Sequence, residues 1–191
     1  MSRKAALVAW VMGLALGAPA LAGSTGTVTV TVTVQFLSIS VTPSSDIAFG
    51  MVALDSKTVT AKGGNTVVVT NDGNEAEDFS IRVSAGTTAT WILGTAGIDA
   101  VDVNTFTLCG RFVDSAADAP AEGDYAAGDV MTGSAKWCDG TQFGGKGHEV
   151  VATTGVCDLY FRLHAPTSVS GAGAGSKHSL TVEVGARQHT P

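Results

Sequence analysis

The sequence predicts an all-β protein, built as an antiparallel β-sandwich of about nine strands with one long loop excursion. Residues Thr27–Val34 alternate strictly between threonine and valine, which is the pattern of a strand with one apolar face. Short alternating segments then recur along the chain, separated by turns rich in glycine, asparagine and aspartate. Beyond the first 22 residues, no stretch of useful length shows the period of an amphipathic helix. These three observations together point to a sandwich or barrel of short strands, of which we favour the sandwich.

The first 22 residues have the three-part organisation of a secretory signal peptide. Arg3 and Lys4 precede an apolar run from Ala5 to Ala18, and Ala20-Leu21-Ala22 supplies small residues for cleavage. The run is too short for a stable membrane span, and no second long apolar stretch follows it, so we expect no transmembrane anchor. The protein is therefore expected to be secreted, held at the cell surface or resident in the periplasm.

Length and charge limit the remaining chain to one domain and a few kinds of partner. Residues 23–191 suit a single β-sandwich domain. Removal of the signal peptide takes away two of the 11 basic residues and none of the 17 acidic residues, which leaves a formal charge of −8. Such an acidic chain is a poor partner for nucleic acid or an anionic membrane. Self-association or a cell-surface partner is expected instead.

The segment Thr27–Val34 is the first predicted strand, and it contains no charge, proline or glycine. At the edge of a sheet, such a strand recruits another chain unless it is covered. Two arrangements follow from this property. The strand can pair with the C-terminal strand Leu180–Val184 of its own domain, which we favour for the isolated chain, or it can complete the sheet of a neighbouring subunit and build a fibre.

Further strands are predicted between residues 39 and 93. A bend is expected near Leu37-Ser38, because the apolar residues change there from even to odd positions. The turn Asn71–Asn74 has strong tight-turn chemistry and is expected to lead into the return strand of a hairpin. The predicted strands of this region are Ile39–Val41, Ile47–Phe49, Lys57–Ala61, Thr66–Thr70, Phe79–Val83 and Thr90–Leu93.

Two core strands follow, at Thr105–Phe112 and Cys157–Leu163, where large apolar residues occupy alternate positions. Between them, residues 114–147 lose this period and form the long excursion, with at most a short strand at Lys136-Trp137. Shorter strands are predicted at His148–Ala152 and Leu180–Val184, and Gly185–Pro191 is expected to be a frayed tail.

Residues 46–83 resemble a known group of domains. The segment Asp46–Val52, followed by Val67–Asn74, is similar to the Ig-like modules of bacterial surface proteins, of the abnormal-spindle/hydin type or the cell-adhesion-related type. The shared features are a short FG-x-V strand and a V-T-N-x-G-N hairpin. The resemblance implies an Ig-like sandwich with an extracytoplasmic scaffold, adhesive or assembly role, and it implies no catalytic residue.

The three cysteines are an odd set for an oxidising compartment. Cys109 faces away from the apolar face of its strand, Cys157 shares the core face of its own strand, and Cys138 lies in the excursion. We therefore predict a Cys109–Cys138 disulfide, with Cys157 as a buried thiol. The bridge would close a loop of about 28 residues and stabilise the fold by roughly 3–4 kcal/mol. A Cys138–Cys157 bridge with Cys109 free is the alternative.

The acidic residues of the excursion are the candidates for calcium binding, because Ca²⁺ takes oxygen ligands. Their spacing fits no defined calcium loop, so a solvated acidic loop is the favoured interpretation. No other cofactor is expected. The candidates are Asp114, Asp118, Glu122 and Asp124.

No catalytic residue is assigned, and a non-enzymatic protein is expected. The segment Gly140–Gly147 is similar to a phosphate-binding loop, but Gly147 occupies the position where a serine or threonine must bind magnesium. The histidines match no metal motif in their spacing and are interpreted as surface residues at strand ends. They are His148, His164, His178 and His189.

The leading hypothesis for function is a structural or adhesive protein of the cell exterior that assembles through its N-terminal strand. The alternative is an extracellular carbohydrate- or ligand-binding module that uses residues 114–147. Trp137 and Phe143 are then the candidate ligand-binding aromatics, although anchoring of the excursion is the favoured interpretation of both.

Overall fold

The computed structural model describes residues 31–191, apart from residues 33, 43–45, 64, 87–89 and 171–176. The chain divides into two units, Met1–Thr33 and Val34–Pro191, and the fold below is that of the second. The predicted signal peptide and most of Thr27–Val34 lie outside the described residues. Thr31, Val32 and Val34 are described, and none of them lies in a strand.

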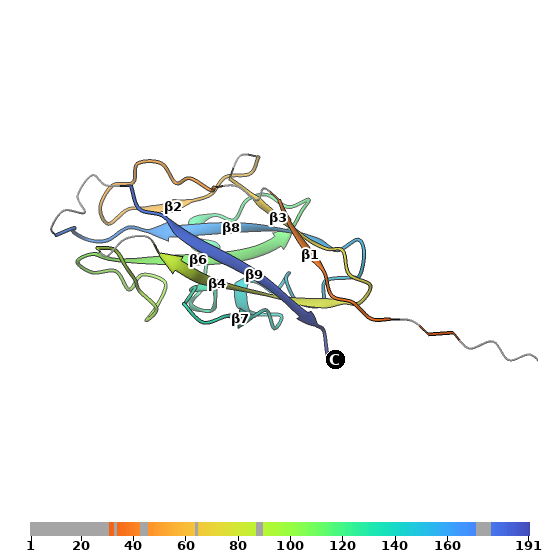
Figure 1. Cartoon of the computed structure of the whole chain (residues 1–191). Helices are drawn as coiled ribbons and strands as arrows, with labels where there is room; N and C mark the ends of the chain where they lie inside the picture. Colours follow the sequence, from red (N-terminus) through yellow and green to blue (C-terminus); the bar gives the residue numbers. More distant parts are fainter. Residues whose placement is uncertain (1–30, 33, 43–45, 64, 87–89, 171–176) are drawn as a thin grey trace, which may run out of the picture. The chain divides into compact units, whose positions relative to one another are not determined.

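The all-β prediction is confirmed, since the described part of the chain contains nine strands in two sheets and no α-helix (Figure 1). No described helix has the length and apolar character needed to cross a membrane. The larger sheet has the order β1 (Ile39–Thr42), β3 (Val67–Asn71), β8 (Val156–His164), β6 (Thr105–Asp114) and β5 (Ile92–Leu93), with β2 (Lys57–Val59) also paired to β8. The smaller sheet has the order β7 (Lys136–Trp137), β4 (Glu77–Gly86) and β9 (Leu180–Gln188).

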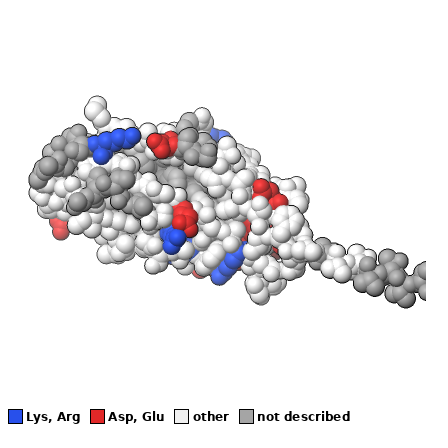
Figure 2. Space-filling model, in the orientation of Figure 1, with Lys and Arg blue, Asp and Glu red and all other residues white. Residues whose placement is uncertain are grey.

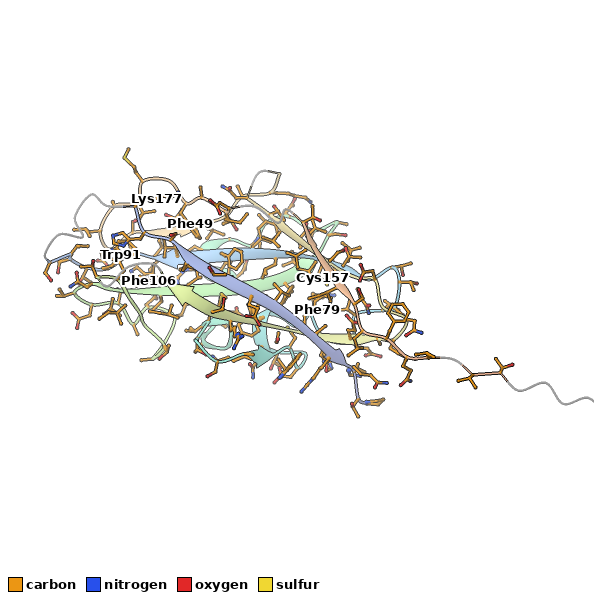
Figure 3. All side chains as sticks on the ribbon, viewed as in Figure 1. Phe49, Phe79, Trp91, Phe106, Cys157 and Lys177 are labelled. Atoms are coloured by element: carbon orange, nitrogen blue, oxygen red, sulfur yellow. The ribbon has the colours of Figure 1, made fainter. Side chains whose placement is uncertain are left out.

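The main core lies between the two sheets. Phe79 and Ile81 of β4 are fully buried against Phe112 of β6 and Leu159 of β8, and the rings of Phe79 and Phe112 lie 5.7 Å apart. Figure 3 places Phe79 and Cys157 between the sheets, with Phe106 and Trp91 nearer the other end. The apolar residues at alternate positions of β4, β6 and β8 therefore point into the core, as the sequence predicts. Side chains on the inner faces of two packed sheets bury one another.

The turn Asn71–Asn74 does not form the expected hairpin. β3 belongs to the larger sheet and β4 to the smaller one, so the turn passes the chain between sheets. The Asn71 side chain is buried, and its amide donates to the carbonyl oxygens of Glu75 and Val150, each at 2.8 Å. The turn residues are therefore held by a distant segment, which local turn chemistry does not reveal.

Three further predictions about the strands were wrong. Gly185–Pro191 is not a frayed tail, because β9 pairs with β4 as far as Gln188 and the His189 backbone N–H donates to the Ala76 carbonyl at 2.8 Å. The segments Ile47–Phe49 and His148–Ala152 are not strands, although Val150 forms an isolated bridge with Glu77. In each case, whether the segment forms a strand depends on whether a neighbouring backbone is placed to form hydrogen bonds with it.

The excursion 114–147 contains three 3₁₀ turns, η1 (Glu122–Asp124), η2 (Ala127–Asp129) and η3 (Gln142–Gly144), as well as β7. Tyr125 and Val130 of the excursion pack on the outer face of β6, where they bury Cys109 in a second, smaller cluster. The excursion residues Cys138 and Phe143 belong to the main core. Gly144 has φ +77°, and a Cβ there would lie 2.6 Å from the Phe112 carbonyl oxygen, so only glycine fits this close approach.

Candidate functional site

The first candidate site is the outer edge of β9. This nine-residue strand pairs with β4 on one side, and its other side has no strand partner in the part of the chain that the structure describes. Its inward residues Leu180, Val182 and Val184 are only partly buried. Ile81, which pairs with Val184, is fully buried, and Val83, which pairs with Val182, is partly buried like its partner. The apolar side chains along this edge of β9 are therefore incompletely shielded from solvent. The edge lies beside β1 (Figure 1).

The residues just before β1 have a fixed position on the domain. The backbone N–H of Phe36 donates to Asn74 Oδ1 at 2.8 Å, and that of Ser38 donates to Glu77 Oε1 at 2.9 Å. Through these hydrogen bonds, the backbone that precedes β1 lies along the turn formed by residues 72–74. Val32 and Val34, which precede them, are 80% and 73% exposed. The pairing expected between Thr27–Val34 and β9 falls mostly on residues outside the described part of the chain.

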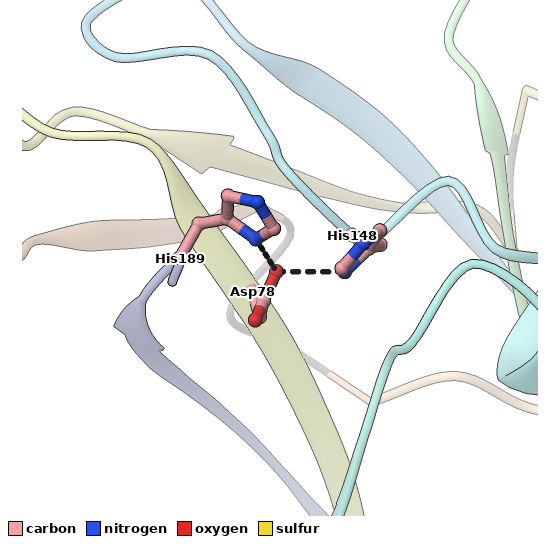
Figure 4. A group of neighbouring side chains, drawn as sticks. All are labelled: Asp78, His148 and His189. Atoms are coloured by element: carbon pink, nitrogen blue, oxygen red, sulfur yellow. Dashed lines mark hydrogen bonds and ion pairs between the residues drawn. The ribbon is translucent and has the colours of Figure 1, made fainter. Parts of the chain in front are cut away.

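The second candidate site is a cluster of Asp78, His148 and His189 (Figure 4). Asp78 Oδ1 lies 2.9 Å from His148 Nδ1 and 2.9 Å from His189 Nδ1. The three atoms all lie within 4.8 Å of one another. The imidazole rings are 4.7 Å apart and nearly perpendicular, so both histidines direct a nitrogen at the same carboxylate oxygen.

The elements on either side of β4 create this cluster. Asp78 lies on the face of β4 opposite to the core residue Phe79. On one side of β4, the Phe79 N–H donates to the Gly147 carbonyl at 2.7 Å, which places His148 beside Asp78. On the other side, β9 pairs Arg187 with Asp78, and His189 follows directly. The three side chains therefore meet only after β9 and the 147–150 segment have docked on β4.

Asp78 is buried, and several donors stabilise its charge. Burial alone would raise the pKa of its carboxyl, but the Glu149 backbone N–H, the His189 side chain and the nearby His148 together lower the pKa below its ordinary value of 3.8. The guanidinium of Arg187 adds two contacts of 3.3 Å to Asp78 Oδ2. Asp78 is therefore an ionised carboxylate that is almost completely buried.

Sequence reasoning did not find this cluster. His148 and His189 are separated by 40 intervening residues, which resembles no metal motif, and His189 lies in the segment that was expected to be frayed. One signal in the sequence was available. The charged residue Asp78 directly precedes Phe79, the first residue of a predicted strand. This feature does not show which side chains Asp78 contacts.

A third group of charges is structural. Arg162 of β8 is 2% exposed and donates to Asp99 Oδ1 at 2.6 Å, and it lowers the pKa of Asp99 to about 2. His164 lies 3.1 Å from both Asp99 and Asp55. These contacts attach two loops to the end of β8, and the Arg162 side chain is thereby paired rather than buried alone.

The predicted Cys109–Cys138 disulfide is not present, because all three cysteines are free thiols in the structure. Cys109 lies with Tyr125 and Val130 on the outer side of β6, whereas Cys138 belongs to the main core. Cys109 does face away from the apolar face of its strand, as predicted. The excursion, however, returns to the other side of the sheet before it reaches Cys138. Cys157 is buried, as predicted, and its thiol lies 2.9 Å from the Lys146 carbonyl.

We expect the thiols to be unreactive until the protein unfolds. Burial raises the pKa of Cys109 and of Cys157 to about 11 and raises that of Cys138 further, so little thiolate is present at neutral pH. Ellman's reagent should release no thionitrobenzoate from the native protein within minutes and three equivalents in guanidinium chloride without reductant. Release of one equivalent would instead indicate a disulfide, and peptide mapping would then identify it.

The four calcium candidates are not brought together. Asp114 forms an ion pair with Lys146 at 3.0 Å, Glu122 lies 3.5 Å from Lys57, and Asp124 accepts the backbone N–H of Ala121 at 2.7 Å. Asp118 is exposed. These carboxylates form no group of three ligand atoms within the described residues, so each contributes to the solvated surface or to its own turn.

The rings of both candidate ligand-binding aromatics pack against other residues of the protein. Phe143 is fully buried in the main core and offers no face to a ligand. Trp137 is partly buried, and the Arg187 guanidinium covers its ring at 4.7 Å from the centroid. The structure thus places Phe143 as an anchor of the excursion, which was the favoured interpretation of the sequence.

No family model matches the chain, and no curated protein matches it.

Proposed function

We propose that this chain is a secreted, non-enzymatic structural protein of the cell exterior, and that it assembles by strand addition between copies. In the proposed contact, Thr27–Val34 of one copy pairs with the outer edge of β9 of the next copy. The open edge of β9 is the observation that carries the proposal. We also propose that the two-sheet domain is an Ig-like sandwich, which is a common scaffold for such roles.

The donor and the acceptor match in length and pattern. Thr27–Val34 has eight residues and alternates valine with threonine, and β9 has nine residues with its apolar residues at alternate positions from Leu180 to Val184. An added strand would place its valines over the core, where the inward residues of β9 are only partly buried. Backbone ladder bonds supply affinity and the alternating side chains supply register.

We propose that a second copy supplies this strand, because the residues that follow it are already held on their own domain. Residues 34–38 continue the line of β1 and are held on the 72–74 turn by Phe36 and Ser38. The visible face around β9 is mostly uncharged, with small separate groups of acidic and basic side chains (Figure 2), so charge repulsion between copies is weak there.

The alternative function, a carbohydrate- or ligand-binding module, has less support. Its aromatic candidates are Phe143, which is buried, and Trp137, which Arg187 covers. Ligand sites of this class depend on an accessible aromatic face. We therefore keep the structural role as the proposed function.

The N-terminal strand can be tested directly. We expect the purified mature chain, Gly23–Pro191, to form oligomers or filaments in gel filtration and electron microscopy. Deletion of Gly23–Val34 should abolish them, and so should the double variant Val30→Lys/Val32→Lys, because charges cannot enter the apolar side of the added strand.

The matched control is Thr29→Ser/Thr31→Ser, which changes the other face of the same segment and should leave assembly intact. Circular dichroism should show the same strand content for all variants. A mature chain that stays monomeric at high concentration, or assembly that survives the two lysines, would refute the proposal.

A further inference from the structure

We propose that Asp78, His148 and His189 form a binding site for one Zn²⁺ ion. The proposal is independent of the assembly proposed above, since it concerns the outer face of β4 and not the edge of β9. It rests on the chemistry of the three ligand atoms, on their spacing and on one histidine nitrogen without a hydrogen bond.

The ligand types select a borderline transition metal. Two imidazole nitrogens and one carboxylate oxygen are a frequent donor set for Zn²⁺, and three protein ligands leave a position for water. Calcium and magnesium prefer sites made of oxygen ligands alone. Asp78 is 3% exposed in its side chain, and His148 is 32% exposed, so the ion would enter past His148.

The spacing of the atoms fits a shared ion. Each histidine Nδ1 lies 2.9 Å from Asp78 Oδ1. A tetrahedral ion with bonds of about 2.0–2.1 Å holds its ligand atoms about 3.3 Å apart, so each histidine nitrogen would move only a few tenths of an ångström from Asp78 Oδ1. Both nitrogens and the oxygen already face each other (Figure 4), so binding needs only small side-chain movements.

Without an ion, the cluster is incompletely hydrogen-bonded. Asp78 Oδ1 accepts the Glu149 backbone N–H at 3.1 Å and contacts His189 Nδ1 at 2.9 Å, which uses both of its lone pairs. His148 Nδ1 is buried and makes no hydrogen bond of acceptable geometry, despite its short distance to the same oxygen. A cation bound between the three atoms would give this nitrogen a partner.

Neighbouring groups would orient the ligands. The Arg187 contacts to Asp78 Oδ2 leave Oδ1 as the oxygen that faces the histidines. Glu149 has a left-handed backbone with φ 51°, and this conformation turns its N–H toward Asp78 and holds the adjacent His148 in place. Such outer contacts commonly fix the orientation of metal ligands.

A bound ion would fasten three distant segments together. Asp78 belongs to β4, His148 to the loop after η3, and His189 follows β9. Binding to the folded state alone stabilises it, so Zn²⁺ at 100 times its dissociation constant should raise the melting temperature by roughly 5–10 °C.

The test uses the untagged full-length mature chain and ZnCl₂ alone. We expect competition with a chromophoric chelator to show one saturable site per chain, and Co²⁺ in place of Zn²⁺ to give visible d–d absorption bands. His189→Gln keeps a hydrogen-bond donor near Asp78 and lies close to the chain end, so it should fold while its Zn²⁺ affinity falls at least 100-fold. His148→Ala should lose binding to the same degree.

The control is His178→Ala, which removes a histidine that stacks on Trp91 at 4.4 Å and should bind Zn²⁺ like the wild type. Absence of saturable binding at 100 µM Zn²⁺ would overturn the proposal. So would binding that is unchanged in folded His189→Gln, or binding that is lost in His164→Gln instead, because the ion would then occupy the Asp55–Asp99 region.

Discussion

Replacement of Phe112 by alanine is expected to lower the free energy of unfolding by about 3–5 kcal/mol. Phe112 is fully buried at the centre of the core, where its ring contacts Phe79 of the opposite sheet. A Cβ built on Gly147 would lie 2.9 Å from the Phe112 ring, which shows how closely the excursion packs on it. The variant would thus leave a cavity shared by both sheets and the excursion.

Urea unfolding followed by circular dichroism measures this loss. The matched control is Val113→Ala, the next residue of β6, which is only partly buried and should cost less than about 1.5 kcal/mol. A Phe112→Ala variant as stable as the control would mean that the two sheets do not share this core.

Replacement of Asp78 by alanine is expected to cost about 2–4 kcal/mol in the presence of EDTA. The variant would leave the Glu149 N–H, both histidines and Arg187 without their common carboxylate. Asp78→Asn retains an oxygen that can accept hydrogen bonds, so it should cost less. The measurement is denaturant unfolding at pH 7, and equal stability of Asp78→Ala and wild type would contradict the prediction.

The cost of Asp78→Ala should depend on pH. Because the pKa of Asp78 is lower in the folded protein than its ordinary value of 3.8, the charged carboxylate contributes stability above that value. This contribution is lost as the pH falls through 3.8 toward the lower folded pKa. The difference between wild type and Asp78→Ala should therefore be largest near neutral pH and shrink toward pH 3, and a difference that grows on acidification would be inconsistent with the assignment.

Much of the strand content could be predicted from local patterns. The apolar residues of Thr105–Phe112 and Cys157–Leu163 alternate, and both segments form long core strands whose inward faces are buried. The prediction that Cys109 points away from the core face of its strand was also correct. These predictions succeed because the face of a strand that lies toward the core repeats its apolar residues every second position, and that pattern is visible in a single segment. The excursion and the loops bury the other face of both strands as well, which the pattern does not reveal.

The candidate metal site could not be predicted in this way. Asp78, His148 and His189 come together because the 147–150 segment and the end of β9 dock on opposite sides of β4. The hairpin expected at Asn71–Asn74 and the Cys109–Cys138 bridge failed for a related reason, since each depends on which sheet a segment joins. A turn motif reports its own backbone angles and not the partner of the strand that follows.

The sequence alone determined that this chain forms strands, where the two main core strands lie, and which of their side chains point inward, because period-2 burial is a local property. Only the tertiary structure decided how the strands divide between two sheets, that one side of β9 has no strand partner among the described residues, and that one carboxylate meets two histidines. These features depend on backbone pairing between segments that are distant along the chain, and the free energy of that pairing belongs to the whole fold rather than to any one segment.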